Sequence, residues 1–483
     1  MRDMVLVLNF DDAASRVVTR KLRSERIFCK IVPGSLSLEE ILSQEPAGLL
    51  LCGGVTGEAP AGLDARLCHA GIPVLALGDA AAPLLQALGG AVGDKALMGA
   101  VLPVTVQPCA LTDGIENGER LIQCARELTL PPQVKAICRA EDVVLGFAHE
   151  EEPLYGVQFQ AEQNDMDGSR MLRNFALTVC RCTTWWDEDA FAARAVEEIG
   201  RVVGDGRAVC AMTGGTASGV SALLAFKALG KNLKCIFVDT GLLRDHEGED
   251  FLSFYRDQIG MDITRVSAEE RFLTALRGVG RPEEKRKIIS DLMHTILNDT
   301  VGRMGAFDAV IRGVSCNDVM LGRENRRLML DDSVPEIKPV QELFKDEIRR
   351  VGDFLGIPTE IISRQPFPGS GLALRILGPV TPERLQTLRA ADAIFRSEVQ
   401  RSGAAKRLWQ YFAVLSPLPG EEDQVVVCLR AVHASERSLA YAARLPYDVM
   451  ETVTDRLLRE RPEIRRVVYD LTPSSNYAGI EWQ

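Results

Sequence analysis

The sequence predicts an α/β protein with two doubly wound parallel-sheet domains, followed by a smaller α+β domain. Short apolar β runs alternate with helical patterns from the N-terminus, which is typical of parallel strands joined by crossover helices. The alternation restarts after an aromatic and acidic break near residues 180–189, and it changes character again after residue 364. We therefore predict domains at 1–183, 184–364 and 365–483.

The first predicted domain contains three apolar runs that end in Gly or Asp, at residues 4–10, 48–54 and 72–78. Residues 155–160 read as a later strand, and residues 169–180 have helical spacing that closes the domain. In the second domain, strands are predicted at 208–215 and 234–243 and helices at 190–204, 218–230 and 342–356. In the third, residues 425–432 and 465–472 read as strands, with a helix within 446–465.

Composition excludes several classes of protein. The net charge of -11 argues against a nucleic-acid partner, for which a basic surface is expected. No apolar run approaches the roughly 20 residues of a membrane span, and the N-terminus lacks the pattern of a secretory signal. The 12 cysteines contain no CxxC pair, which favours buried thiols in a reduced, cytoplasmic protein with no structural metal.

Residues 208–224 combine a strand, a glycine-rich turn and a helix start. Such a turn directs backbone N–H groups and the positive end of the helix at an anion. By itself, the Gly214–Gly215 pair fits a plain tight turn between strand and helix equally well.

The order of segments resembles the N-type ATP pyrophosphatases, whose turn reads Ser-Gly-Gly-x-Asp-Ser. The segments 237–244, 283–290 and 342–352 are similar to later segments of that family. Residues 365–378, 391–398, 429–432, 445–450, 466–472 and 480–483 resemble the dimerisation domain of GMP synthase. The resemblance runs from residue 1 to 483 and implies a class I glutamine amidotransferase domain, flavodoxin-like in fold, and an adenine nucleotide α-hydrolase-like domain. It also implies ATP and Mg²⁺ as cofactors, a purine nucleotide ligand (XMP, GMP or ATP) and a homodimer through residues 365–483.

The catalytic residues of the amidotransferase family are not at their expected positions. Alignment of residues 72–90 puts Gly78 at the position of the family's cysteine nucleophile, and residues 155–162 put Gln160 at the position of its histidine. Glu162 is retained. Amide hydrolysis there requires a thiolate, so we predict that this domain does not hydrolyse glutamine. Cys52 falls at the family's oxyanion loop and also reads as a buried strand-end thiol. Asp79 is either a substitute carboxylate nucleophile or a helix start.

The synthetase motifs are retained only in part. Thr213, Gly214, Gly215 and Ser218 match the phosphate turn, whereas Ala217 replaces the family's Asp and Gly219 its second Ser. Loss of that carboxylate is expected to weaken Mg²⁺ binding. Arg312 and Val314 replace the Gln and Thr of a strand-end motif, and the family's His-His-Asn-Val-Gly-Gly lid has no counterpart. At the C-terminus a phosphate-contacting Lys is missing, while Glu481 remains.

Four charged residues elsewhere are candidates for nucleotide binding by this resemblance. Asp239 and Arg244 follow a strand end where the family binds adenosine. Arg375 is a candidate for a nucleotide phosphate or a structural ion pair. Arg286 lies on the charged face formed by Lys285, Arg286 and Lys287, which we otherwise expect to be solvated.

Two functions fit these observations. The first is a non-catalytic or regulatory homologue that binds a purine nucleotide. The second is a repurposed ligase that activates XMP or a related nucleotide with ATP and uses free ammonia. A glutamine-dependent enzyme would require a nucleophile at position 78, where this sequence has glycine.

Overall fold

The computed structural model describes residues 3–54, 63–159, 167–320, 328, 333–365, 367–418, 420–434 and 440–473. Its contacts divide the chain into two compact units, residues 1–191 and 192–483. The three-domain division with boundaries after residues 183 and 364 stays a prediction. In the described part of the chain, no helix has the length and apolar character needed to cross a membrane.

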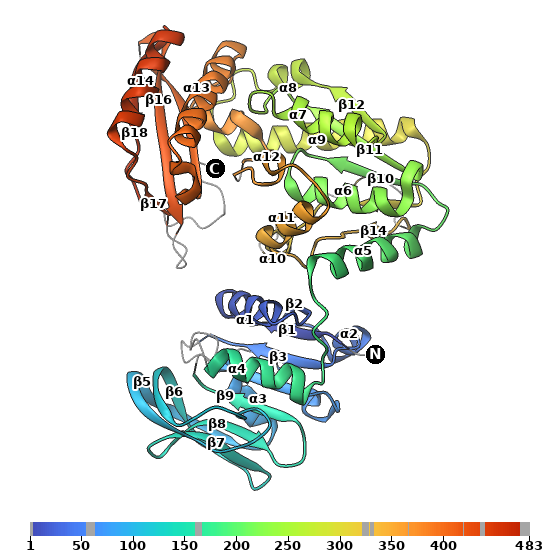
Figure 1. Cartoon of the computed structure of the whole chain (residues 1–483), viewed down its shortest axis with the longest axis vertical. Helices are drawn as coiled ribbons and strands as arrows, with labels where there is room; N and C mark the ends of the chain where they lie inside the picture. Colours follow the sequence, from blue (N-terminus) through green and yellow to red (C-terminus); the bar gives the residue numbers. More distant parts are fainter. Residues whose placement is uncertain are drawn as a thin grey trace. The chain divides into compact units, whose positions relative to one another are not determined.

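The first unit is built on one nine-stranded mixed sheet with the order β2-β1-β3-β4-β9-β8-β7-β5-β6 (Figure 1). Its parallel half consists of β1 (Val5–Asn9), β2 (Cys29–Pro33), β3 (Gly48–Cys52), β4 (Val74–Leu77) and β9 (Leu154–Val157). These strands confirm the runs predicted near residues 4–10, 48–54, 72–78 and 155–160. They carry apolar residues on both faces because helices cover both sides, as expected for a parallel sheet.

Helices α1 (Asp12–Ser24) and α4 (Asp167–Arg173) contribute to the core on one face of this sheet. The other face is covered by α2 (Leu38–Ser43), the 3₁₀ turn η1 (Ala65–His69) and α3 (Ala81–Ala87). The predicted closing helix at 169–180 is present as α4 followed by a π-helical turn, Asn174–Val179.

The predicted parallel sheet is extended by four antiparallel strands, which the sequence patterns did not indicate. These strands are β5 (Ala91–Val106), β6 (Gly118–Thr129), β7 (Val134–Ala140) and β8 (Val143–His149). β5 and β6 form a long hairpin with several register shifts, seen at the lower left of Figure 1. Because one face of this hairpin is exposed, its strands lack the continuous apolar runs of the parallel half.

In the second unit, a five-stranded parallel sheet has the order β12-β11-β10-β13-β14. Its strands are β10 (Ala208–Met212), β11 (Leu233–Asp239), β12 (Ile263–Ser267), β13 (Ala309–Ile311) and β14 (Glu336–Ile337). The helices of this part are α5 (Glu188–Val203), which begins in the first unit, α6 (Thr216–Leu229), α7 (Glu247–Leu252), α8 (Glu269–Ala275), α9 (Pro282–Met304), α10 (Cys316–Met320), α11 (Lys345–Phe354) and α12 (Thr359–Ile362). The predicted helix at 218–230 ends at Gly230, and that at 342–356 ends before Gly356, which has φ +82°.

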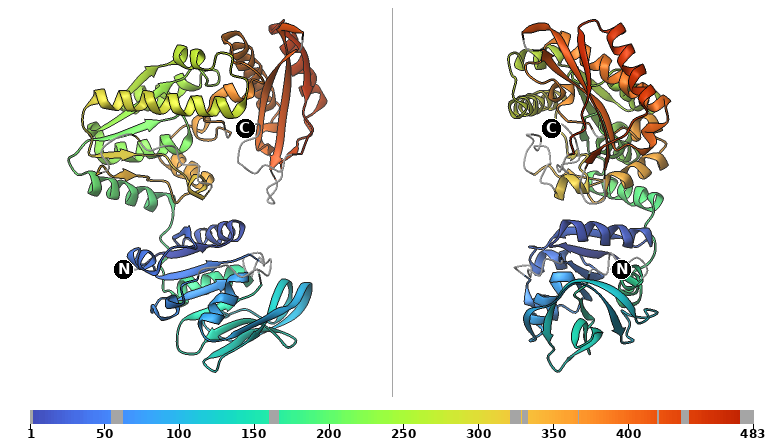
Figure 2. Two further views of the ribbon diagram at one scale, coloured as in Figure 1. Left: turned by 180° about the vertical axis from the view of Figure 1, so that it is seen from behind. Right: turned by 90° about the vertical axis from the view of Figure 1, so that its left-hand side faces the viewer.

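The last part of the chain is the predicted α+β module. β15 (Gln410–Leu418), β16 (Glu421–Ala434) and β17 (Ala440–Ala442) are antiparallel, and β18 (Ile464–Tyr469) pairs with β16 in parallel. Figure 2 shows α13 (Pro382–Arg401) and α14 (Tyr447–Glu460) alongside this sheet. α13 contacts both β15 and α14.

Candidate functional site

The turn after β4 has the backbone geometry of a nucleophile elbow, although its tip is a glycine. Strand β4 ends at Leu77, Gly78 follows with φ +62°, and the 3₁₀ turn η2 (Gly78–Ala80) leads into α3. A left-handed φ costs a residue with a Cβ about 1–2 kcal/mol, so it favours glycine. The sharp strand-to-helix turn is therefore present, but its tip residue has no side chain.

Close contacts with a neighbouring loop leave no room for a side chain at this elbow. A Cβ on Gly78 would lie 2.3 Å from the carbonyl oxygen of Gly54 and 2.7 Å from that of Gly53. The Asp79 N–H, which follows the elbow, donates to the Gly54 oxygen at 2.7 Å. At a functional elbow, the N–H at this position stabilises an oxyanion. Here that donor is already bonded within the protein.

Of the other residues predicted in this region, the structure describes Cys52 and Asp79. Cys52 is fully buried at the end of β3, as one of its two interpretations expected. Asp79 lies in the first turn of η2, in line with its interpretation as a helix start. Gln160 and Glu162 lie outside the described residues. Of the 12 cysteines, 10 are buried, in agreement with their predicted role as small apolar residues.

The second predicted site is the turn between β10 and α6. The Thr213 N–H donates to Ser218 Oγ at 3.2 Å, and Ser218 Oγ donates to the Gly215 carbonyl at 2.9 Å. Gly214 has φ +80°, and Gly215 is the N-cap of α6. The four retained residues of the phosphate turn therefore lie together at the start of a 14-residue helix.

Two neighbours press closely against this turn. A Cβ on Gly313, just after β13, would lie 2.3 Å from the Ser218 Cα. A Cβ on Gly219 would lie 2.2 Å from the hydroxyl oxygen of Tyr255, a buried residue. The family's second Ser therefore has no space at position 219, because the Tyr255 hydroxyl occupies it.

The residues around this turn do not fit a magnesium ion. Mg²⁺ prefers an octahedral set of oxygen ligands that includes carboxylates, and position 217 offers only a methyl group. Asp239, at the end of the neighbouring strand β11, accepts the Gly241 N–H at 3.1 Å and forms an ion pair with Arg265. Across the described ranges, no three His, Cys, Asp or Glu side chains converge as metal ligands.

Asp239 therefore orders the loop that follows β11 in this structure.

The prediction for the charged face of α9 needs a correction, because Lys285 is 1% exposed. Its Nζ donates to the carbonyls of Ala373 and Ile376, at 3.1 and 2.6 Å. Arg286 is half-buried and Lys287 is exposed. Helix α9 thus places one of its three consecutive cations in the interior of the protein.

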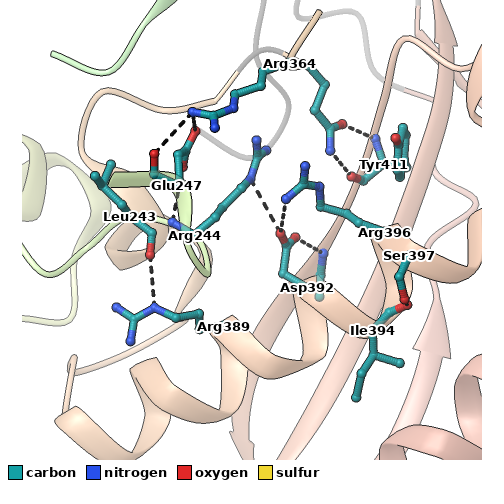
Figure 3. A network of polar contacts seen from close by, with 12 residues as sticks. Leu243, Arg244, Glu247, Arg364, Arg389, Asp392, Ile394, Arg396, Ser397 and Tyr411 are labelled. Atoms are coloured by element: carbon teal, nitrogen blue, oxygen red, sulfur yellow. Dashed lines mark hydrogen bonds and ion pairs between the residues drawn. The ribbon is translucent and has the colours of Figure 1, made fainter. Parts of the chain in front are cut away.

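The remaining predicted cations, Arg244 and Arg375, converge on one buried carboxylate (Figure 3 shows Arg244). Arg244 Nε lies 3.5 Å from Asp392 Oδ2, and Arg375 Nη1 lies 3.7 Å from Asp392 Oδ1. Arg396 Nη1 approaches the same carboxylate at 3.9 Å. We call Arg244, Arg375, Arg396 and Asp392 the arginine cluster. The side chains of Arg244, Arg375 and Asp392 are at most 2% exposed.

These ion pairs are too long to be good hydrogen bonds. The Nε, Nη1 and Nη2 atoms of Arg244 and Arg375 are buried and have no hydrogen-bond partner among the described residues. Aromatic rings supply part of their contacts. The ring centroid of Phe367 lies 4.1 Å from the Arg244 guanidinium carbon, and that of Phe412 lies 3.9 Å from the Arg375 guanidinium carbon. Burial, together with the charge of Arg244, lowers the pKa of Arg375 to about 9, although Asp392 opposes this shift.

Positive charge exceeds negative charge around the arginine cluster. Glu247 faces Arg364 at 3.7 Å and accepts the backbone N–H of Arg244 at 3.2 Å. Arg364 also pairs with Asp250 at 3.5 Å, so four guanidinium groups lie near three carboxylates. Burial of an uncompensated charge costs several kcal/mol, and such sites are concentrated at functional positions. The net positive charge favours an anionic ligand group such as a phosphate monoester.

Comparison with known proteins shows which family this chain resembles. The family model described as "Glutamine amidotransferase class-I" matches residues 6–179, and that described as "GMP synthase C terminal domain" matches residues 397–482. A GMP synthase [glutamine-hydrolyzing] of Clostridium botulinum is 35% identical over 518 residues, with full coverage of both chains. That of Clostridium novyi is 35% identical over 509 residues and covers 100% of this chain and 99% of its own length. The chain belongs to the GMP synthase family.

This membership confirms the predicted resemblance to GMP synthase. A crystal structure of a putative GMP synthase protein from Thermoplasma acidophilum covers 38% of the chain and 95% of its own length at 20% identity, with a TM-score of 0.33. Within the GMP synthase fold, the predicted residues are distributed over separate places. Thr213, Gly214, Gly215 and Ser218 form one turn, whereas Arg244 and Arg375 belong to the arginine cluster. Glu481 lies outside the described residues.

Sequence reasoning missed Asp392, Arg396 and Phe367 as members of the site. Their segments indicated only a dimerisation domain. A usable signal was present, because Asp392 and Arg396 are spaced by one helical turn and lie on the same face of α13.

Proposed function

We propose that this GMP synthase homologue is a non-catalytic or regulatory protein that binds a purine nucleotide and has lost glutamine hydrolysis. The observation that carries this proposal is the arginine cluster, in which two buried guanidinium groups form only long ion pairs with Asp392 and no hydrogen bond among the described residues. Such groups gain most from a dianionic phosphate, since charge-assisted bonds to phosphate are strong and bidentate. The phosphate of XMP or GMP is the ligand group that we assign to them.

The absence of catalysis is proposed from two features at the positions of the family's active sites. Glycine at position 78 has no nucleophilic group, and the adjacent Asp79 N–H is bonded to Gly54. The turn after β10 carries Ala217 where a metal-binding carboxylate is expected. ATP thus remains a candidate ligand of the Thr213–Ser218 turn, but its Mg²⁺ would lack a protein carboxylate there.

The second candidate function is an ammonia-dependent ligase that activates XMP with ATP. The compact turn formed by Thr213, Gly214, Gly215 and Ser218 favours it. Position 217, the arginine at position 312 and the missing lid oppose it. A homodimer through residues 365–483 is also proposed, supported by exposed apolar side chains on the C-terminal module, namely Tyr441, Tyr447, Leu458, Val468 and Leu471. A monomeric mass in light scattering would contradict the dimer.

Nucleotide binding tests the proposed function directly. We expect saturable binding of XMP or GMP in calorimetry, with the same dissociation constant in EDTA and in Mg²⁺. Arg375→Met should weaken it by about 10- to 100-fold, because a charged hydrogen bond contributes about 1.5–3 kcal/mol. Arg465→Met, at a surface position on β18, is the matched control and should bind as the wild type does. Equal binding by the Arg375 variant would overturn the assignment.

A further inference from the structure

We infer that Arg389, on α13 of the C-terminal module, is a positioning residue that fixes residues 240–246. We call these residues the nucleotide loop. This inference rests on the proposed function, because the loop carries Arg244 of the arginine cluster. Nothing in the sequence motifs or the family matches assigns a role to Arg389.

Three consecutive carbonyl groups of the nucleotide loop accept hydrogen bonds from residues that follow position 370. Arg389 Nη2 donates to the Gly241 carbonyl, and Arg389 Nε donates to that of Leu243 at 3.1 Å. Between them, the Leu242 carbonyl accepts the Leu372 N–H at 2.8 Å. One guanidinium fork thus spans the loop, and a backbone bond fixes its centre.

The local backbone is built for this close approach. Gly371 has φ +64°, and a Cβ there would lie 2.3 Å from the Leu242 carbonyl oxygen. Any other residue would push residues 371–372 away from the loop and break the central bond. The loop also has its own turn bonds: the Leu242 N–H donates to Thr240 Oγ1 at 3.1 Å, and the Gly241 N–H donates to Asp239.

The face of α13 that holds the loop also bears the carboxylate of the arginine cluster. Arg389 and Asp392 are three residues apart, so one helix face contacts both the loop carbonyls and the Arg244 side chain (Figure 3). Further along α13, Glu398 pairs with Arg456 of α14 at 2.6 Å. The position of Arg244 is therefore tied to the packing of α13 within the C-terminal module.

An arginine suits this role for a physical reason. Its planar fork offers donors to two carbonyl groups at once, whereas a lysine ammonium is a single point donor on a flexible stem. Arg389→Gln removes the fork, and Arg389→Lys keeps the charge and restores at most one of the two bonds. We therefore expect graded effects, with the Lys variant between the wild type and the Gln variant.

The test combines two measurements on the full chain. Hydrogen exchange without ligand should show about tenfold faster exchange of the 241–244 amides in Arg389→Gln, with a smaller increase in Arg389→Lys. Binding of XMP or GMP should weaken by about tenfold in Arg389→Gln, corresponding to roughly one lost charged hydrogen bond. Arg384→Gln is the matched control, because Arg384 lies on the same helix and its guanidinium donates to the nearby Pro379 carbonyl rather than to the nucleotide loop. It should change neither quantity.

The outcomes separate this inference from the proposed function. Wild-type nucleotide binding with unchanged exchange and affinity in Arg389→Gln would overturn the inference and leave the proposed function standing. Failure of the wild type to bind any nucleotide would reject the proposed function, and the exchange data would still decide whether Arg389 fixes the loop. If Arg389→Gln does not fold, Arg389→Lys provides both measurements.

Discussion

Asp392→Asn is expected to lower the free energy of unfolding by about 3–5 kcal/mol, the usual cost of removing one partner from a buried ion pair. Asp392 is the carboxylate shared by Arg244, Arg375 and Arg396, and its side chain is 1% exposed. Its Oδ1 also accepts the Ala413 N–H at 3.1 Å. Asparagine keeps the size and one acceptor but leaves the surrounding guanidinium groups without a counter-charge.

Urea unfolding of the wild type and Asp392→Asn measures this cost. Asp455→Asn, an exposed carboxylate on α14, is the matched control and should change stability by no more than about 0.5 kcal/mol. Because the variant lacks its internal anion, added phosphate should stabilise it more than it stabilises the wild type. A loss below about 1 kcal/mol in Asp392→Asn would show that the arginine cluster does not depend on this carboxylate.

Gly78→Cys is expected to lower the free energy of unfolding by about 3 kcal/mol and to leave the protein without glutaminase activity. Left-handed φ costs a non-glycine residue about 1–2 kcal/mol, and a clash in a tightly packed place adds about 1–3 kcal/mol. The new Cβ would meet the Gly53 and Gly54 carbonyl oxygens, so the thiol could enter only by displacing that loop.

Gly71→Cys separates the two causes. Gly71 has φ +67°, close to the +62° of Gly78, but no heavy atom lies within 4 Å of its built Cβ among the described residues. This variant should lose only the part due to φ, about 1–2 kcal/mol. Equal losses of unfolding free energy in the two variants would show that the Gly53–Gly54 loop moves aside without a measurable cost. Glutamine hydrolysis by Gly78→Cys would show that the elbow is still competent.

Much of the fold could be predicted because its strands and helices have clear local patterns. The runs at 4–10 and 48–54 are apolar on both faces, and the helix at 342–356 is bounded by Gly356. The antiparallel strands β5–β8 were not predicted, because half-exposed strands with register shifts leave weak alternation in the sequence.

The site was less predictable because its energetics depend on contacts between distant segments. Arg244 and Arg375 were singled out individually, yet their common partner Asp392 emerges only when α13 lies against the nucleotide loop. The burial of Lys285 was not predicted for a similar reason. Its neighbours in sequence are charged and suggest a solvated face, whereas the carbonyls that accept its hydrogen bonds come from the distant residues 373 and 376.

The measurement that tests the central claim most directly is pyrophosphate release by the purified protein with Mg-ATP, XMP and ammonium chloride, beside the same assay with glutamine. The account predicts no turnover with either nitrogen source, together with XMP or GMP binding in calorimetry. Turnover with ammonium but not glutamine would contradict the non-catalytic assignment and establish an active synthetase behind an inactive glutaminase.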